Sequence, residues 1–499
     1  MLIDSKEKLV DLRDNNIMAQ KEFCHKLYKL GNFLASFLFS SKLISMGDDS
    51  EKVTQIASIE KMGYPNIAKE LIKTEKEELD YLVKYWDGDR DIIDDFLTIA
   101  NDSNQKHDVE DDIYKHTDLK DILSKAWYFN YQDNDIHFFT YPGYNIHFLR
   151  VGKEILVLDC GTQPREFVDV DIFSFLNSKG YSPKMIVGAL ISHAHYDHYS
   201  CLQYLPQDIS IYFTKETKDL IFIMNKEFLE GKRLSLIEEN NTFECGIFKI
   251  TPIKNGHVLG SVAFDIEVAG KRLLYTGDFS LHDQMLLKGF DVDALRRRGK
   301  IDYLVSEHTY GQKDFAIRYE DAAKCLAYAV DFLVGLGLKV FIPAFSIGRA
   351  QEVVNIIGRY CKTKPKVLID GLAKEVTFYY ENRVGGVLPL NTALSFSSDI
   401  EKNIKEADVI IASSGMLQPS STAVRYLNLL KDIRFGFVKT GYIEEQQYIH
   451  EMVKVLINSN IHYFDISLSA HSNYFELIYT FNVLSPQKII LVHGWGIKN

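Results

Sequence analysis

The stretch HAHYDH (193–198) constrains the possible fold more than any other part of the sequence. It places three histidines and an aspartate directly after the apolar run MIVGALIS (185–192). Small and β-branched residues dominate this run, which predicts a buried strand that ends where the histidines begin. Side chains two residues apart share a face of an extended chain, so His193 and His195 can point the same way. Asp197 and His198 follow as the chain turns. Imidazole and carboxylate groups bind zinc and related metals, and two such pairs suit two neighbouring ions.

A histidine-rich polar loop is the alternative interpretation of this stretch. The chain has 15 histidines in 499 residues, so three of them and an aspartate within six positions are improbable by chance. Three further candidate ligands lie where other predicted strands begin or end. His257 precedes the alternating strand SVAFDIEV, Asp278 follows the apolar stretch RLLYTG, and His493 closes the strand KIILVHG. These three residues and the first cluster make a set of seven.

At this point the chain resembles the metallo-β-lactamase fold in its β-CASP branch of nucleic-acid-processing enzymes. That branch includes the endonuclease subunit of pre-mRNA 3′-end processing, its archaeal relatives and ribonuclease J. The stretches LVLDCGT, SHAHYDH, NGHVLGS and YTGDFS resemble the first four motifs of the family. The resemblance runs from about residue 135 to the end, and it implies that Asp159 in the first motif orients the ligand loop.

The resemblance implies two zinc ions, with manganese as the alternative metal, and a carboxylate shared between them. The expected ligands of the first ion are His193, His195, His257 and Asp278. The expected ligands of the second ion are Asp197, His198, Asp278 and His493.

Two further motifs separate a nuclease from other users of this fold. DYLVSEHTYG resembles the motif of the branch that carries an acidic residue, here Glu307, and ISLSAHSNYFEL resembles the motif with a catalytic histidine, here His471. Cleavage of a phosphodiester needs a proton for the departing sugar oxygen, and a histidine held by a carboxylate can supply it. We therefore expect His471 to be the general acid and Glu307 to orient it, with Asp197 as the third catalytic residue. A capping glutamate and a surface histidine are the alternative.

Two segments predict a strand, a glycine-containing turn and a helix: residues 339–361 and residues 408–421. A helix N-terminus offers free N–H groups to an anion, and Ser346 is expected to cap the first of these helices. Both segments resemble stretches that frame the nucleic-acid channel of the β-CASP family. The expected substrate-binding residues are Ser346, Gly348, Arg349, Ser413, Ser414 and Gly415.

The chain departs from the family pattern in three places. Gln418, Pro419 and Ser420 stand where the family often has two glycines, and GYIEEQQYIH (441–450) replaces a stretch that often carries Gly-Thr and an arginine. Trp495 follows VHG where a glutamate is usual. The second of these departures, with two glutamates where a phosphate is expected to approach, falls on the expected substrate channel.

The resulting fold prediction is α/β: a metallo-β-lactamase αββα sandwich, an inserted β-CASP α/β domain and an added N-terminal helical domain. Residues 135–310 and 456–499 are expected to form the two parts of the core, and residues 311–455 the insert. Residues 1–130 match no motif. They are acidic, and apolar residues recur there at helical spacing within 21–44, 68–86 and 118–129. Dimerisation, contact with a partner protein and substrate gating all remain open as roles of residues 1–130.

Composition narrows the function and location. A net charge of −11 does not favour nonspecific coating of nucleic acid, but two metals and a few arginines suffice inside a cleft. The basic triplet 296–298 is most simply a solvated loop. The sequence has no uninterrupted apolar stretch of about 18 residues, which argues against a membrane span. The charged start is unlike a signal peptide, and six scattered cysteines without a C-x-x-C pair suggest a reducing cytoplasm.

The function we predict is hydrolysis of RNA or single-stranded DNA by a two-metal phosphodiesterase. Hydrolysis of a small ester, thioester or nucleotide is the first alternative, because the fold alone does not determine the substrate. An inactive scaffold subunit is the second alternative, but scaffold copies usually lose metal ligands and all seven are present here.

Overall fold

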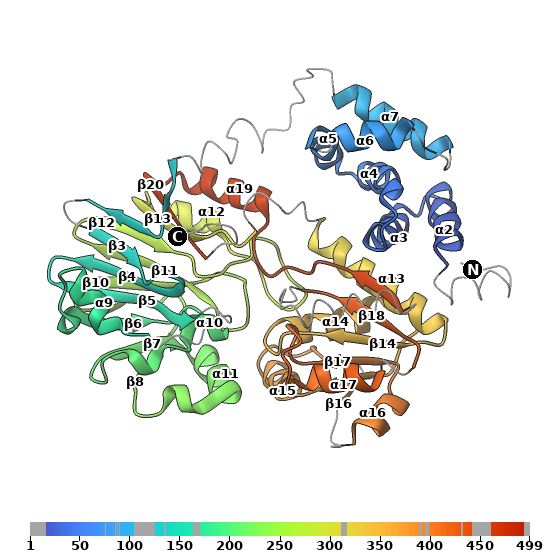
Figure 1. Ribbon diagram of the computed structural model, residues 1–499. Helices are drawn as coiled ribbons and strands as arrows, with labels where there is room; N and C mark the ends of the chain where they lie inside the picture. The colour runs from blue at the N-terminus through green and yellow to red at the C-terminus, as the bar shows by residue number, and fades with distance from the viewer. Residues whose placement is uncertain are drawn as a thin grey trace. The chain divides into compact units, whose positions relative to one another are not determined.

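The protein is described by a computed structural model that covers the following residues: 16–74, 76–84, 86, 88, 90–103, 125–133, 136–162, 170–310, 317–388, 392–394, 399–430, 433–441 and 461–493. The contacts between residues divide the chain into two compact units (Figure 1). One unit comprises residues 111–316 and 469–499, which we call the core unit. The other comprises residues 1–110 and 317–468, which we call the insert unit.

The core unit contains two seven-stranded sheets. The first sheet has the strands β2 Asn130–Gln132, β3 Ile136–Thr140, β4 Tyr144–Val151, β5 Glu154–Thr162, β6 Ile186–Leu190, β7 Ser210–Thr214 and β8 Arg233–Ile237, in that order. The second sheet has, in spatial order, the strands β1 Trp127–Tyr128, β20 Lys488–Val492, β13 Tyr303–Glu307, β12 Lys271–Tyr275, β11 Val262–Val268, β10 Phe248–Lys254 and β9 Phe243–Cys245.

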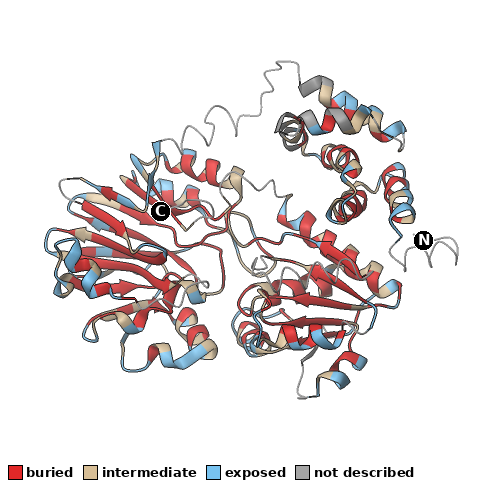
Figure 2. Cartoon of the chain, viewed as in Figure 1, coloured by how far each residue is buried: buried red, intermediate tan, exposed pale blue. Residues whose placement is uncertain are grey.

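Buried side chains from both sheets form one apolar cluster, so the sheets pack face to face. Phe138 and Leu156 of the first sheet and Phe264 and Ile490 of the second are all fully buried in it. Strands buried on both faces appear as near-continuous red ribbons in Figure 2. Burial of such side chains is the main favourable term in folding.

Helices cover the outer face of each sheet. The ring of Phe175, on α9 (Ile172–Ser178), lies 5.9 Å from the ring of Phe148 in the first sheet. On the second sheet, α12 (Val292–Arg297) and α19 (Tyr474–Leu484) pack through their own apolar cluster. The remaining helices of this unit are short or peripheral: η2 Pro183–Met185, α10 Tyr196–Tyr199, η3 Leu202–Tyr204, α11 Lys215–Asn225 and η4 Lys226–Leu229. The predicted αββα sandwich is confirmed.

Parallel strands bring the loop residues of the predicted motifs in this unit to one edge. Strands β12, β13 and β20 pair in parallel, with Glu307 opposite Val492. Because the carboxyl ends of parallel strands meet at the same edge, the residues that follow them are neighbours. The His308 N–H donates to the carbonyl oxygen of His493 (3.0 Å), which ties the two strand ends together.

The insert unit contains a six-stranded, wholly parallel sheet. Its strands, in spatial order, are β16 Thr392–Leu394, β15 Val367–Asp370, β17 Val409–Ala412, β14 Lys339–Pro343, β18 Phe435–Lys439 and β19 His462–Asp465. Its helices are α13 Tyr319–Gly335, α14 Arg349–Tyr360, α15 Leu372–Val384, α16 Ile400–Glu406 and α17 Thr422–Leu430. The predicted α/β insert is confirmed.

The N-terminal residues of the insert unit are helical, as predicted. The helices are α2 Ile17–Lys29, α3 Phe33–Ser45, η1 Asp49–Glu51, α4 Lys52–Lys61, α5 Pro65–Thr74, α6 Lys76–Lys84 and α7 Arg90–Ser103. They pack on α13 and β19 through aromatic side chains. The Phe39 ring lies 5.0 Å from that of Phe332 and 5.7 Å from that of Phe464, both edge-to-face.

Two details differ from the sequence-based expectations. Residues 127–128 form strand β1, which pairs in parallel with β20, so the helical spacing read over 118–129 is wrong at its C-terminal end. Strand β19 pairs with β18 although it lies beyond residue 455, where we expected the insert to end. The division of the chain into these three domains stays a prediction.

The six cysteines are all buried thiols with no disulfide between them. Among the residues that the structure describes, no helix is both long and apolar enough to cross a membrane.

Candidate metal centre and catalytic histidine

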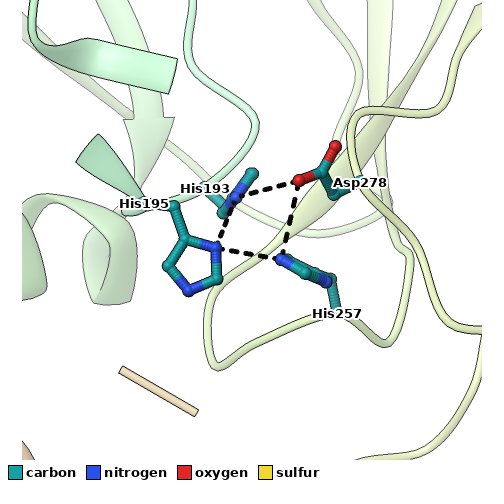
Figure 3. A group of neighbouring side chains, drawn as sticks. All are labelled: His193, His195, His257 and Asp278. Carbon is teal, nitrogen blue, oxygen red and sulfur yellow. Dashed lines mark hydrogen bonds and ion pairs between the residues drawn. The ribbon is translucent and has the colours of Figure 1, made fainter. Parts of the chain in front are cut away.

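The first predicted ligand group is assembled at one end of the sandwich of the core unit. Figure 3 shows the side chains of His193, His195, His257 and Asp278 pointing toward one another. His195 Nδ1 lies 3.0 Å from both His193 Nε2 and His257 Nε2. Asp278 Oδ2 lies 3.7 Å from His193 Nε2 and 3.8 Å from His257 Nε2. Bonds of about 2.0–2.2 Å to one tetrahedral metal leave its ligand atoms at separations of this size.

The second predicted group lies on the other side of Asp278. His198 Nε2 lies 3.5 Å from Asp197 Oδ2 and 3.3 Å from Asp278 Oδ2. His493 Nε2 lies 3.1 Å from Asp197 Oδ2, and His493 Nδ1 lies 3.7 Å from Asp278 Oδ1. Asp278 is therefore within reach of both groups, which is the position that a shared ligand needs.

Two atoms in these groups fit a bound metal for an independent reason. His198 Nε2 and Asp278 Oδ1 are buried and have no hydrogen-bond partner among the described residues. A buried polar atom without a partner destabilises a protein by about 1–3 kcal/mol. A cation between the two groups would interact favourably with both atoms. The ligand atoms and these two unpaired atoms therefore fit a metal cofactor.

The electrostatics of the histidines divide them into two kinds. Burial lowers the pKa of His193, and the neighbouring His198 lowers it further, so its imidazole is neutral and ready to bind a metal. Burial alone would lower the pKa of His198, but the carboxylates of Asp278, Asp197 and Asp159 raise it well above its ordinary value. A metal ion at this position would replace the proton on His198, since metal binding releases ligand protons.

Asp159 lies behind the second group and accepts four hydrogen bonds from three residues. It accepts hydrogen bonds from the main-chain N–H and hydroxyl of Ser192 (2.6 and 2.7 Å) and from the Tyr275 hydroxyl (2.6 Å). It also accepts from His198 Nδ1 (2.8 Å), which leaves Nε2 of that ring directed at the other ligands. Asp159 has φ of 53°, a conformation that aspartate tolerates better than most residues. Its contacts are those expected of a carboxylate that orients a metal ligand.

His471 and Glu307 lie beside the first ligand group. His471 Nδ1 is 3.0 Å from both carboxylate oxygens of Glu307 and 4.0 Å from Asp278 Oδ2. Glu307 is only 1% exposed and also accepts a hydrogen bond from the Phe279 N–H (2.8 Å). Burial would lower the pKa of His471, but the adjacent Glu307 carboxylate raises it above its ordinary value. The pair can hold a proton on the histidine near neutral pH.

Sequence reasoning missed the residues that hold these side chains in place. Thr309 donates its hydroxyl to Glu307 and lies 3.0 Å from His493 Nδ1. His257 Nδ1 donates to the Ala470 carbonyl (2.8 Å), which leaves its Nε2 facing the first group. Thr309 stands two residues after Glu307 in the motif, but one sequence gives no signal that distinguishes it from any other threonine after a strand.

The six predicted substrate-binding residues of the insert unit fall into two sets. Arg349 and Gly415 line a small pocket together with Phe345, Lys439 and Thr440. In this pocket the Arg349 Nε and Nη1 atoms and the Thr440 hydroxyl are buried without a hydrogen-bond partner in the described chain. Thr440 was not predicted, although it directly follows a strand of the parallel sheet.

The other four residues build the turns around this pocket. Gly348, with φ of 85°, precedes α14 as its N-cap, and its N–H donates to the Gln351 side chain (2.8 Å). The expectation that Ser346 caps this helix is therefore wrong, because its carbonyl accepts from Gln351 instead. In the turn after β17, the Ser414 hydroxyl accepts from the Met416 N–H (3.1 Å), whereas the Ser413 hydroxyl accepts from the Ala373 N–H of α15 (3.4 Å). Of the three departures from the family pattern, residues 442–450 and Trp495 lie outside the described residues.

The fold and the ligand cluster define the class of this protein. Residues 142–308 match the family model described as the Metallo-beta-lactamase superfamily. Together with the histidine–aspartate cluster, the match assigns the protein to the metal-dependent hydrolases, as predicted.

Within that class, the most informative relatives are RNA-processing proteins. The RNase J-like protein of Methanocaldococcus jannaschii is 29% identical over 68% of this chain and 87% of its own length. The cleavage and polyadenylation specificity factor subunit 3 of Dictyostelium discoideum is 27% identical over 69% of this chain, and the endoribonuclease ysh1 of Schizosaccharomyces pombe is 25% identical over 70%. The chain spans 50% and 52% of the length of these two. The predicted resemblance to the β-CASP branch is confirmed.

A solved structure supports the fold alone. The crystal structure of a protein of unknown function from Enterococcus faecalis V583 aligns with a TM-score of 0.52 and 14% identity, over 70% of this chain and 91% of that one.

Proposed function

We propose that this protein is a two-metal phosphodiesterase that cleaves RNA or single-stranded DNA. The observation that carries the proposal is the His471–Glu307 pair beside the ligand cluster, with Nδ1 of the histidine 3.0 Å from both carboxylate oxygens. Two metals alone would serve many hydrolases. A protonated histidine next to them supplies what a phosphodiester needs in addition, a proton for a poor leaving group.

The proposed metals are two zinc ions, with manganese as the alternative. The first would be held by His193, His195, His257 and Asp278, and the second by Asp197, His198, Asp278 and His493. When bound, the metals supply Lewis-acid charge and lower the pKa of water.

The chain's own residues would perform the remaining steps. Because Glu307 occupies Nδ1 of His471, the proton for the leaving sugar oxygen would come from Nε2 of that ring. Asp159 would keep His198 in the tautomer that presents Nε2 to the metal. The Asn145 amide donates to Asp197 Oδ2 (3.2 Å) and would hold this carboxylate in place during turnover.

Substrate binding would extend to the insert unit. The unpartnered Arg349 nitrogens and Thr440 hydroxyl line a small pocket at the start of α14. We propose that the Arg349 and Thr440 side chains contact a phosphate of the polynucleotide. The relatives named RNase J-like protein and endoribonuclease support RNA as the substrate.

The test compares the metal-loaded full chain with its His471→Ala variant on end-labelled RNA and single-stranded DNA. The variant should keep its metals and its fold while losing about 10²–10⁴-fold in cleavage rate. Glu307→Gln should lose less and shift the pH profile, because the histidine would keep its position but lose its charged partner. Cleavage by His471→Ala at the wild-type rate would contradict the proposed general acid.

The same preparations should be assayed on a small ester and a thioester. Turnover of these compounds with no cleavage of either polynucleotide would show that the protein belongs to the other hydrolases of the superfamily. The product ends, read from 5′- and 3′-labelled substrates, would give the direction of attack.

A further inference from the structure

An exposed aromatic ring stands between two of the proposed metal ligands. Tyr196 separates His195 and Asp197 in the ligand loop and is the first residue of α10. Its side chain is 43% exposed, whereas Tyr199, one helical turn later, is 1% exposed. Tyr199 is thus part of the core, and burial in the core does not explain an aromatic residue at position 196.

The ring is held at its edges by other rings. Tyr196 lies 5.8 Å from Phe228 and 6.0 Å from Tyr199, at interplanar angles of 82° and 71°. Tyr199 and Phe228 in turn lie 5.3 Å apart at 80°. Edge-to-face contacts of this kind are favourable and fix the orientation of a ring. A fixed and partly exposed ring loses little conformational entropy when a flat ligand stacks on it.

We propose that Tyr196 is the platform on which the nucleobase next to the scissile phosphate stacks. The proposal rests on the proposed nuclease function. Adjacent Cα atoms are about 3.8 Å apart, so the backbone of Tyr196 cannot lie far from the ligands His195 and Asp197. We expect a strand whose phosphate reaches the metals to place a neighbouring base close to this ring. Aromatic side chains bind bases of single strands in this way without sequence preference.

The experiment is a double-mutant cycle in which the Tyr196 ring is removed by mutation and the base by an abasic nucleotide. An oligonucleotide series carries one abasic nucleotide, stepped along the strand, and is cleaved by the metal-loaded wild type and by Tyr196→Ala. We expect one position next to the cleavage site at which the wild type loses about 5- to 150-fold in kcat/KM, the usual range for one stacked base. Tyr196→Ala should lose the same factor on the intact strand and be insensitive to the abasic nucleotide at that position.

Three further variants separate stacking from damage to the ligand loop. Tyr196→Phe keeps the ring, so it should remain sensitive to the abasic nucleotide at that position. Tyr196→Leu keeps apolar bulk against Tyr199 and Phe228 but should match Tyr196→Ala, with unchanged metal content. Phe173→Ala, which removes a ring that is equally exposed at 43% on α9, should have no effect.

The outcomes distinguish this inference from the function on which it rests. If Tyr196→Ala and Tyr196→Leu remain as sensitive as the wild type to every abasic position, Tyr196 is not the platform, while the nuclease function stands. If the wild type cleaves neither RNA nor single-stranded DNA, both the function and this inference are overturned.

Discussion

Gly161 and Asp159 show how residues that touch no metal can determine where ligands lie. Asp159 directs the His198 ring through one hydrogen bond, and Gly161 lets the ligand loop approach strand β5. A Cβ atom at Gly161 would lie 2.1 Å from the main-chain carbonyl of Asp197. The first motif is therefore required for the second ligand group even though it contributes no ligand.

We predict that Gly161→Ala displaces Asp197 and His198 and weakens one of the two metals. The clash is with main chain, so a side-chain rotation cannot relieve it. Elemental analysis should show about one metal per chain in place of two. Gly335→Ala is the matched control, because a Cβ there meets no atom within 4 Å. Full metal content in Gly161→Ala would mean that the loop can shift without losing its ligands.

Replacement of Asp278 should lower the metal content more than replacement of any other single ligand. Asp278 lies within 3.3–3.8 Å of histidines in both groups, so Asp278→Ala should remove most of both metals. His493→Ala should mainly weaken the second metal. Metal content measured after dialysis of the purified variants is the readout. Retention of two metals in Asp278→Ala would contradict its role as the shared ligand.

At the scale of elements, strands could be predicted from the sequence where an apolar run ends directly at a ligand motif. The strands that precede His193, Asp278 and His493 were each predicted, and each lies where expected. The helix cap was missed because Ser346 and Gly348 are both plausible caps, and only the backbone geometry decides between them. The extent of the insert was missed because the pairing of β19 with β18 is a long-range contact.

The start of α14 carries a prediction about binding. Arg349→Ala should raise the KM for a polynucleotide and reduce the salt dependence of binding by about 0.7 in log–log slope, as expected for one lost phosphate contact on a single strand. Arg359→Ala, at the exposed end of the same helix, is the control. An unchanged slope in Arg349→Ala would make Arg349 a packing residue.

Helix α3 carries a prediction about pH. Lys42 is 1% exposed, with Nζ 3.4 Å from Met46 Sδ and 5.6 Å from the ring centroid of Phe464. Burial lowers its pKa from 10.5 to about 7. The unfolded chain keeps this proton up to about pH 10, so between pH 7 and 10 it binds more protons than the folded chain. Stability should therefore rise with pH across this window.

The expected gain across the whole window is about 5 kcal/mol, since each pKa unit is worth about 1.4 kcal/mol. Urea unfolding at pH 7.5 and pH 9.5 should show about 3 kcal/mol of this rise in the wild type and a smaller rise in Lys42→Met. Equal slopes in the two proteins would mean that Lys42 is hydrated in solution.

At the scale of the whole molecule, the candidate ligands and catalytic residues all belong to the core unit, while the N-terminal helices belong with the insert. The helices cover Phe332 and Phe464 of the insert unit through Phe39. Their loss would expose an apolar surface without removing any proposed ligand. Composition and motifs could not predict this packing, because apolar stripes specify that a helix is covered but not by what.

Deletion of residues 1–103 should therefore leave the metal content intact and reduce the solubility or stability of the insert unit. Elemental analysis and thermal unfolding of the truncated protein are the measurements. Phe39→Ala is the mild version of the same change, and it should destabilise the full chain by about 3–5 kcal/mol. A truncated protein that folds but binds no metal would place the helices within the active centre.

The discontinuous core unit has a consequence for biosynthesis. Proteins are made from the N-terminus at about 5–20 residues per second, and domains fold as they emerge. Six of the seven proposed ligands and the orienting Glu307 precede residue 317, but His471 and His493 come from the segment that returns after the insert. The emerging chain therefore lacks its proton donor and has an incomplete second ligand group until the segment after the insert has been translated. A metal-dependent nuclease built in this order would stay inactive until the returning segment has been made.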